Sequence, residues 1–441
     1  MNRTLLPDLV TLRELVRACV EGKVEQGHDL TGLRLSSVPD SYDALLAFAE
    51  QLAAAPLRRD WPYDEPLDLS YLPELPAVAA GDVSARVETA FLARVAGCML
   101  GKPFEFDPTL SELRSVLEPA GEWPLRDYVT EATHALVREP QPQWPELVRE
   151  RITHVCEDDD LNYTVLAMLL LERHGDDFTA DEVRRLWLLQ LPVLATFGPE
   201  RVQLLAAGVA SFLPGTQGNW ADVLNPYDEH CGALIRADAY GYACPGDPRR
   251  AARLAFRDAS VTHRRTGVYA TMFIAAAIAN ALVADPSDRL GPFEAALSVV
   301  PPLSRFFQIA GDSLLRVQAA GDWLEGYESI HGKYAQYSHC RVYQEIGTLF
   351  NTARFATDVG HGIGLQVCQG NDTDSFGATA GSYLGALLGP AGFDRAHWLG
   401  RFGDTIHLAL ATFHEQSLSR LAQRMARLSA VPAVPSIHPS E

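Results

Sequence analysis

The sequence contains few cysteines, and they do not follow the patterns of a disulfide scaffold or a zinc ribbon. Seven cysteines are scattered through 441 residues without a CxxC pair, which indicates neither kind of structure and suits a reducing compartment. The first residues, MNRTLLPDLVTLRELV, lack the apolar core and small-residue cleavage site of a signal peptide. Apolar runs elsewhere are broken before they reach membrane length. We therefore expect a cytoplasmic protein without a membrane span.

Basic residues are also in the minority. The chain has 37 Lys and Arg against 56 Asp and Glu, which gives a net charge of −19 at pH 7. A surplus of negative charge repels polynucleotides and anionic lipids, whereas it attracts cations. We expect no nucleic-acid partner and no membrane partner.

The signatures of several catalytic mechanisms are missing as well. The sequence contains no GxSxG elbow, no cysteine in a protease-type signature and no HExxH pair among its 13 histidines. Nucleophilic catalysis by serine or cysteine therefore has no support in the sequence.

Strand-type alternation is nearly absent, whereas apolar residues recur every three or four positions over most of the chain. Helices are expected over residues 42–54, 83–100, 161–174, 180–191, 199–210, 248–257, 268–284, 303–319, 323–331 and 344–356. This pattern predicts an all-α protein, a large multi-helix bundle. We expect a helical and proline-rich extension at 1–80, one all-α catalytic domain at 81–430 and a flexible tail at 431–441.

An acidic motif precedes a helix with an unusual run of glycines. Asp372-Thr373-Asp374-Ser375 stands directly before four glycines spaced four apart, Gly377, Gly381, Gly385 and Gly389. Residues four apart share one helical face, and glycine costs roughly 1 kcal/mol relative to alanine inside a helix. The spacing therefore predicts a face on which a partner helix approaches closely, with the acidic first turn held at the interface.

A second acidic cluster, Glu157-Asp158-Asp159-Asp160, precedes the apolar helix that starts at Leu161. Acids at a helix start also cap free amides and complement the helix dipole, which is the ordinary explanation of a single cluster. Two such clusters favour a metal site, because hard divalent cations prefer oxygen ligands and a pair of ions needs carboxylates from separate elements.

Several segments resemble motifs of the ADP-ribosylglycohydrolase family, in the family's order. Residues 157–167 (EDDDLNYTVLA) are similar to its T-D-D-T motif, and residues 370–389 (GNDTDSFGATAGSYLGALLG) to its G-G-D-T-D motif. Residues 96–105 (AGCMLGKPFE) resemble G-D-A-L-G-x-P-x-E, residues 232–240 (GALIRADAY) resemble G-x-x-M-R, and residues 260–263 resemble a Thr-His pair. The resemblance implies an all-α fold of the large orthogonal multi-helix bundle type. It also implies glycosidase activity on an N- or O-ribosyl bond.

The resemblance further implies a binuclear site for two Mg²⁺ or Mn²⁺ ions that bind the ribose hydroxyls. Its ligands would be Asp158, Asp159, Asp160, Asp372, Asp374 and Ser375. Glu105 falls on the glutamate that gates the site or handles the attacking water, so Glu105 and Asp159 are the catalytic candidates, as proton acceptors. Three positions depart from the family pattern, because Asp158 and Leu161 replace threonines and Cys98 replaces an aspartate.

The resemblance places substrate contacts at Glu105, His230, Gly232, Arg236 and His263. A turn histidine or a salt-bridged arginine would explain two of these positions without any function. Asp228 and Glu229 stand where family members have small residues before a diphosphate, which carboxylates would repel. This argues against full ADP-ribose and for a smaller riboside, whereas the resemblance implies an ADP-ribosyl small molecule or modified protein as substrate.

Two other interpretations fit the same residues. One is a catalytically silent riboside- or ADP-ribose-binding module on the same fold. The departures from the family pattern at Asp158, Leu161 and Cys98 favour it. The other is an all-α scaffold protein whose acidic clusters only cap helices. The sequence leaves the oligomeric state open, with a dimer as one option.

Overall fold

Helices are the main secondary structure in the parts of the chain that the structure describes. This computed structural model describes residues 8–33, 40–105, 108–137, 143–204, 222–337 and 340–430. Within these ranges it contains no β-strand and only isolated β-bridges. The α-helices are α1 (Leu9–Glu25), α2 (Tyr42–Ala53), α3 (Ser84–Gly101), α4 (Leu110–Leu117), α5 (Glu131–His134), α6 (Trp144–Leu147), α7 (Asp159–His174), α8 (Ala180–Gln190), α10 (Asp238–Tyr242), α11 (Pro248–Ala259), α12 (Arg265–Ala281), α13 (Gly291–Ala296), α14 (Arg305–Ala319), α15 (Trp323–Tyr334), α16 (Tyr343–Phe355), α17 (Val359–Cys368), α18 (Thr373–Leu388), α19 (Arg395–Leu399) and α20 (Leu418–Leu428). The predicted all-α fold is confirmed.

The helices that the apolar spacing predicts lie within a few residues of the observed ones. The helix expected at 83–100 is α3, and the one expected at 161–174 is α7, which begins two residues earlier at the acidic cluster. Of the helix expected at 199–210, residues 199–204 are helical and the rest lies outside the described residues. The tail expected at 431–441 also lies outside them.

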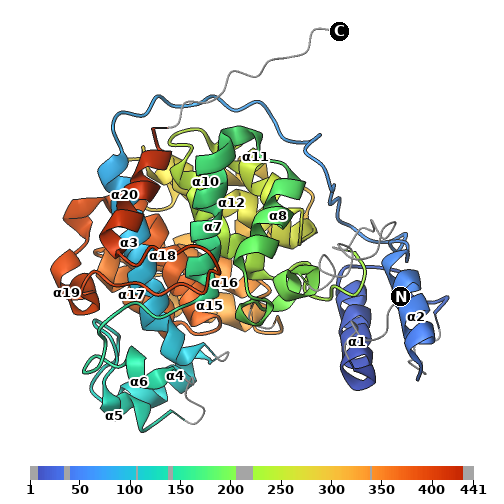
Figure 1. Cartoon of the computed structure of the whole chain (residues 1–441), viewed down its shortest axis with the longest axis horizontal. Coiled ribbons are helices and arrows are strands. Elements are labelled where there is room, and N and C mark those ends of the chain that lie inside the picture. The colour runs from blue at the N-terminus through green and yellow to red at the C-terminus, as the bar shows by residue number, and fades with distance from the viewer. Residues whose placement is uncertain are drawn as a thin grey trace.

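Helices α3 and α18 lie side by side in the body of the molecule (Figure 1), and small residues bring their backbones into contact. A Cβ atom on Gly97 would lie 2.0 Å from the carbonyl oxygen of Gly377, and one on Gly381 would lie 2.2 Å from that of Ala93. Only glycine allows this approach. Gly389, the last of the four glycines, ends α18 with a φ of 63°. The predicted close-packed face is therefore real, and its partner is α3.

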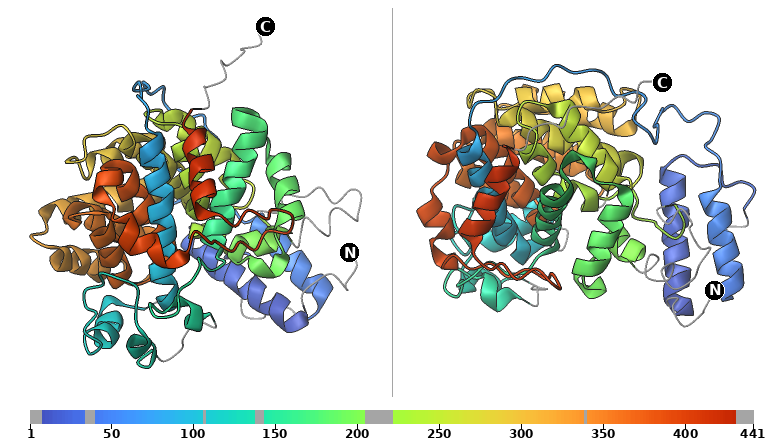
Figure 2. Two further views of the ribbon diagram at one scale, coloured as in Figure 1. Left: turned by 60° about the vertical axis from the view of Figure 1, so that its left-hand side comes forward. Right: turned by 45° about the horizontal axis from the view of Figure 1, so that its top comes forward.

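The first two helices form a hairpin with an apolar cluster of its own. Its buried side chains include Leu12, Val16, Leu45 and Leu52. From α2 an extended segment, residues 54–83, runs over the body of the molecule to α3, as Figures 1 and 2 show. The extension thus wraps around the helical body and does not simply precede it.

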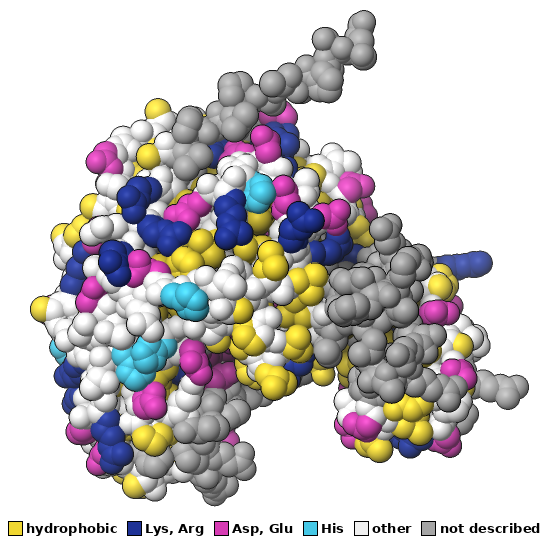
Figure 3. Space-filling model, in the orientation of Figure 1, with side chains coloured by type: hydrophobic (Ala, Val, Ile, Leu, Met, Phe, Trp, Pro, Cys, Tyr) yellow, Lys and Arg dark blue, Asp and Glu magenta, His cyan; other side chains and the backbone are white. Residues whose placement is uncertain are grey.

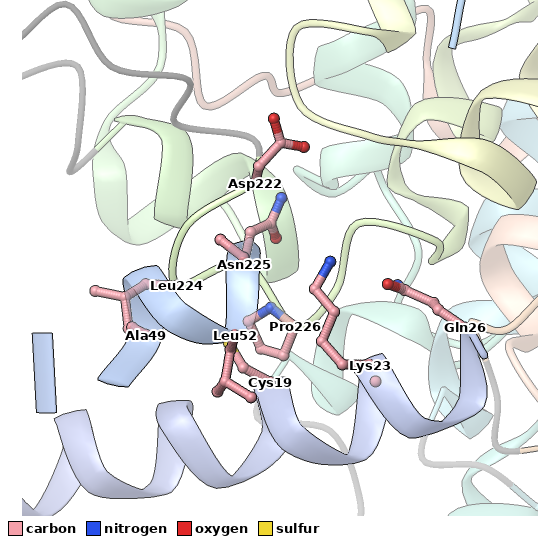
Figure 4. A pocket seen from close by; sticks show the side chains of 11 residues that line it. Cys19, Lys23, Gln26, Ala49, Leu52, Asp222, Leu224, Asn225 and Pro226 are labelled. Atoms are coloured by element: carbon pink, nitrogen blue, oxygen red, sulfur yellow. The ribbon is translucent and has the colours of Figure 1, made fainter. Parts of the chain in front are cut away.

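The hairpin contacts a loop of the body that leads toward the predicted substrate segment. Figure 4 shows Leu224, Asn225 and Pro226 of this loop beside α1 and α2. At the end of α1, the Gln26 amide donates to the Asp228 carboxylate at 2.7 Å. The loop leads directly into a 3₁₀-helix, residues 231–236, which carries part of the predicted substrate segment.

None of the helices in the described ranges combines the length and apolar character needed to cross a bilayer. On the face drawn in Figure 3, the visible basic side chains are interspersed with acidic and apolar ones.

Candidate functional site

The two acidic motifs meet inside the bundle. Asp158 caps the start of α7, because its side chain accepts a 2.9 Å hydrogen bond from the Asp160 amide. Across the interface, the hydroxyl of Ser375 in the first turn of α18 donates to the Asp160 carboxylate at 3.1 Å. One oxygen each from Asp158, Asp160 and Asp374 lies within 4.8 Å of the others. Side chains 215 positions apart in the chain therefore share one cluster.

Two buried basic side chains balance part of this charge. Lys102, which directly follows α3, places its Nζ 2.5 Å from an oxygen of Asp158. Arg94, in the middle of α3, lies 3.0 Å from Asp160 and 2.7 Å from Asp238. The extra charge that Asp158 brings in place of a threonine is thus matched by Lys102.

The other carboxylates of the cluster are hard to ionise together. Burial, and then the charge of Glu105, holds the pKa of Asp374 well above its usual range. Burial and the charge of Asp158 raise the pKa of Glu105 to about 7, and burial raises the pKa of Asp372 to about 6. Protons relieve this repulsion in the absence of metal, and a divalent cation would relieve it while leaving the carboxylates ionised.

The donor set fits a hard divalent cation. Ligand oxygens about 2.0–2.1 Å from Mg²⁺ lie about 3–4 Å from one another in an octahedral site. One oxygen each from Asp158, Asp160 and Asp374 lies within 4.8 Å of the others, so movements of about an ångström would bring them to this spacing. The Ser375 hydroxyl adds a further oxygen beside them. These residues would hold such an ion.

A pocket of about 190 Å³ opens beside the cluster and gathers most of the predicted site residues. The predicted residues that line it are Glu105, Asp159, Asp160, His230, Gly232, Asp372, Asp374 and Ser375. Glu105 and Asp159 are only half-buried, so water reaches both catalytic candidates. Asp158 is buried with Lys102 beneath the pocket.

Arg236 and His263 do not line this pocket. Arg236 is buried, and its guanidinium donates to Glu200 at 2.8 Å, to Asp258 at 2.7 Å and to Thr262 at 2.9 Å. His263 is buried beside Thr262, with 2.7 Å between ring and hydroxyl, and burial holds its pKa well below the usual value. Both residues support the pocket wall from behind, and a substrate contact by either stays a prediction.

The pocket contains an acid that the sequence patterns do not indicate. Glu200 lines the pocket although its side chain is almost fully buried. It also explains the glycine at 232, because a Cβ there would lie 2.5 Å from a Glu200 oxygen. In the sequence, Glu200 follows Pro199 at a helix start, where an acid is ordinary. Lys102 did carry a signal, since it lies inside the segment at 96–105 that resembles a family motif.

The two carboxylates that were expected to repel a diphosphate face elsewhere. Asp228 accepts a hydrogen bond from Gln26 at 2.7 Å, and Glu229 pairs with Arg305 at 2.5 Å. Both are buried and neither lines the pocket. The sequence argument against a diphosphate is therefore wrong, because the N-terminal extension and α14 engage both side chains.

The fold and the site together define a class: an all-α protein with a cluster of buried carboxylates that could hold a metal ion. The sequence model of the family described as ADP-ribosylglycohydrolase matches residues 80–432. The chain belongs to the ADP-ribosylglycohydrolase family, as its motifs suggested, and membership supports a glycohydrolase.

One solved structure similar to this chain is described as an ADP-ribosylglycohydrolase-related protein complex. It is 19% identical, the match covers 79% of this chain and 99% of that chain, and the TM-score is 0.46. No curated protein matches the chain significantly.

Proposed function

We propose that this protein is a metal-dependent glycohydrolase that cleaves the anomeric bond of an ADP-ribosyl or other ribosyl conjugate. The observation that carries the proposal is the junction of the two acidic motifs at one pocket, where Ser375 and Asp160 are 3.1 Å apart. Helix capping requires no such convergence, which speaks against a scaffold protein whose acids only cap helices.

The site would use two Mg²⁺ or Mn²⁺ ions. Their ligands would be drawn from Asp158, Asp159, Asp160, Asp372, Asp374 and Ser375, which all belong to the first turns of α7 and α18 or the residues just before them. When bound, such ions orient ribose hydroxyls and lower the pKa of a coordinated water.

Glu105 is the best-placed proton acceptor among the chain's own residues. Its carboxylate lines the pocket, and burial together with Asp158 raises its pKa to about 7. A base whose pKa lies near neutral pH accepts a proton from water more readily than an ordinary glutamate does. Asp159, on the same pocket wall, is the alternative acceptor. The surrounding carboxylates also favour the positive charge that develops on the sugar in an oxocarbenium-like transition state.

The pocket's size limits how much of the substrate it encloses. Its volume of about 190 Å³ is below the roughly 300–1,000 Å³ of sites that surround a drug-sized ligand. We infer that the pocket receives the ribosyl group to be cleaved, while the remainder of the conjugate lies outside. With Asp228 and Glu229 turned away from the pocket, a diphosphate meets no repulsion from them.

Hydrolysis assays test the proposal directly. ADP-ribosyl-arginine, ADP-ribosyl-serine peptides and simple nucleosides are incubated with Mg²⁺, with Mn²⁺ and after chelation. We expect metal-dependent turnover of at least one of them, and a loss of about 10²–10⁴-fold in Glu105→Gln, which removes a general base. The exposed Asp60, on the extended segment, provides the control variant Asp60→Asn, which should keep full activity.

A catalytically silent riboside-binding module is the second candidate, and Lys102 favours it. Its ammonium group holds the Asp158 carboxylate at 2.5 Å and so competes with a cation for that oxygen. Calorimetric titration separates the two functions. Binding of metal and riboside without turnover of any substrate would establish the silent module and contradict the hydrolase.

A further inference from the structure

Two cysteine thiols meet one carboxylate at the wall of the pocket. Cys231 begins the 3₁₀-helix after the 222–230 loop, and Cys340 lies in the turn before α16. The Cys231 sulfur is 3.2 Å and the Cys340 sulfur 3.3 Å from the same Asp372 oxygen. All three ligand atoms lie within 4.8 Å of one another. Three separate parts of the chain thus deliver two sulfurs and one oxygen to a single point.

The surrounding backbone holds this group together. Glu345, which is almost fully buried, accepts hydrogen bonds from the amides of Cys340 at 3.2 Å, Val342 at 3.1 Å and Asp372 at 3.2 Å. Cys340 and Val342 have φ angles of 65° and 59°, which are uncommon for residues other than glycine and persist where neighbouring contacts impose them. One carboxylate therefore ties the turn that carries Cys340 to the start of α18, which carries Asp372.

The hydrolase proposed above has no need of sulfur. Hard cations such as Mg²⁺ take oxygen ligands, whereas thiolates select softer metals such as Zn²⁺. In a tetrahedral zinc site, Zn–S bonds of about 2.3 Å and Zn–O bonds of about 2.0–2.2 Å separate sulfur and oxygen ligands by about 3.5 Å. The observed sulfur–oxygen distances of 3.2 and 3.3 Å would reach this value by a movement of a few tenths of an ångström.

We propose that Cys231, Cys340 and Asp372 form a second kind of metal site, which binds one thiophilic divalent cation of the Zn²⁺ class. On binding, two S–H bonds break, two metal–sulfur bonds and one metal–oxygen bond form, and two protons leave to solvent without any change of oxidation state. Water fills the fourth position. Because Asp372 is also a proposed ligand of the hard ions, a bound soft cation blocks the pocket. That last consequence alone rests on the proposed function.

Cobalt titration tests the site without any substrate. Co²⁺ replaces Zn²⁺ at thiolate sites and gives a near-ultraviolet charge-transfer band, which oxygen ligands alone do not give. With reduced protein and a non-thiol reductant, we expect this band to saturate at one equivalent of Co²⁺ and to disappear in Cys231→Ser/Cys340→Ser. A band that persists in the double variant, or no band in the wild-type chain, would overturn the proposal.

Cys156 supplies the matched control. Its thiol belongs to another group that could hold a metal, with Glu146 and His154, so it is the main competitor for Co²⁺ among the described cysteines. The band should survive in Cys156→Ser. Its loss in that variant, with retention in Cys231→Ser/Cys340→Ser, would assign the metal to the other group and refute the site proposed here.

A second measurement needs no variant and therefore no assumption about folding. Cys340 is half-buried, whereas the other cysteines are buried, so iodoacetamide should modify it first. We expect one equivalent of Zn²⁺ to slow alkylation of Cys340 by at least about tenfold, and Mg²⁺ to leave it more than half as fast as without metal. Equal rates with and without Zn²⁺ would contradict the proposal. Since neither readout involves a riboside, failure of the hydrolase and failure of this site are distinguishable.

Discussion

At the scale of single residues, the charge balance of the acidic cluster depends on Lys102 as well as on the aspartates. Its side chain is 9% exposed and its partner Asp158 is 1% exposed, with 2.5 Å between them. A buried ion pair adds little net stability compared with an apolar pair, yet removing only one partner leaves a buried charge without compensation. The pair therefore makes the protein sensitive to change at either position.

Lys102→Met should lower the free energy of unfolding of the metal-free protein by about 3–5 kcal/mol, because the buried Asp158 carboxylate loses its partner. Mg²⁺ should then restore stability to the variant more than to the wild type, since the ion takes over the role of the ammonium group. Thermal unfolding with and without Mg²⁺ measures both effects. The control is Lys333→Met, whose ion pair with Asp312 is 44% exposed on the lysine side and should contribute less than about 1 kcal/mol. Equal losses of unfolding free energy in the two variants would contradict a special role for the buried Lys102–Asp158 pair.

A second residue-scale effect concerns Asp228, which lies outside the metal cluster. Burial, followed by the charge of Glu229, raises its pKa to about 6, although Lys23, Arg265 and the Gln26 hydrogen bond act in the opposite direction. The folded chain therefore binds this proton more tightly than the unfolded chain, whose aspartate has a pKa of about 3.9. The resulting stability is complete below about pH 4 and is lost as the pH rises through about 6.

Asp228→Asn imitates the protonated acid and should remove this pH dependence. At pH 7.5 we expect the variant to be more stable than the wild type by up to about 3 kcal/mol, which corresponds to a shift of about two pKa units. At pH 4 the two proteins should be equally stable. Denaturant unfolding at both pH values checks the prediction. Asp68→Asn is a suitable control, because hydrogen bonds lower the pKa of Asp68 and its replacement should not stabilise the protein. If Asp228→Asn were no more stable than the wild type at pH 7.5, ionisation of Asp228 would not destabilise the folded chain, contrary to the prediction.

Individual site residues differ in how far the sequence reveals them. Asp160 and Asp374 were predictable, because each stands in an acidic run at the start of an apolar helix and resembles a family motif. Glu200 and Cys340 were not, because an acid after Pro199 and a scattered cysteine have no local pattern. They reach the pocket only through tertiary packing, as the 2.8 Å contact between Glu200 and Arg236 illustrates.

At the scale of elements, the contact between α3 and α18 fixes the distance between the site residues that follow α3 and those in the first turn of α18. The glycines of α18 allow backbone contact with α3, so the last turn of α3 is set against the first turn of α18. A Cβ on Gly101 would lie 2.1 Å from the carbonyl oxygen of Thr373. Lys102 follows α3 directly, and Glu105 follows the 3₁₀-turn Lys102–Phe104, so this packing sets their position relative to Asp374.

Gly381→Ala should therefore destabilise the protein and weaken metal binding at a distance. The new methyl group would lie 2.2 Å from the backbone oxygen of Ala93, which cannot rotate away, so the helices must separate. Overpacking of this kind costs about 1–3 kcal/mol or more. The control is Gly332→Ala in α15, where the added atom meets open space and should stabilise the helix by up to about 1 kcal/mol.

Thermal unfolding and Mg²⁺ titration by calorimetry measure the outcome for both glycine variants. A Gly381→Ala protein as stable as Gly332→Ala would show that the α3–α18 interface tolerates separation. The glycine spacing alone predicted a close helix partner, because residues four apart share a face. It did not identify α3 as that partner, because small residues at 93, 97 and 101 are compatible with many helix contacts.

At the scale of the whole molecule, the N-terminal extension joins the two loops that form the rim of the pocket. Gln26 donates to Asp228 in the loop before Cys231. Its neighbour Glu25 pairs with Arg341, the residue after Cys340, at 2.9 Å. We propose that the end of α1 holds both loops in place from outside the body matched by the family. Nothing in the local sequence of the extension indicated this role, since it depends on where α1 ends.

Glu25→Ala/Gln26→Ala in the full-length chain should loosen both loops while leaving the helical body intact. Loss of one hydrogen bond and one charged contact costs about 1–2 kcal/mol, which corresponds to roughly 5- to 30-fold faster local opening. Hydrogen exchange followed by mass spectrometry should show this acceleration in residues 222–232 and 340–345 and little change in α12. Glu21→Ala, one turn earlier on the exposed side of α1, should leave both loops unchanged. Acceleration confined to α1 and α2 would mean that the hairpin rests on the body without holding the pocket rim. Acceleration in both loops would show that the end of α1 holds the two loops beside the site.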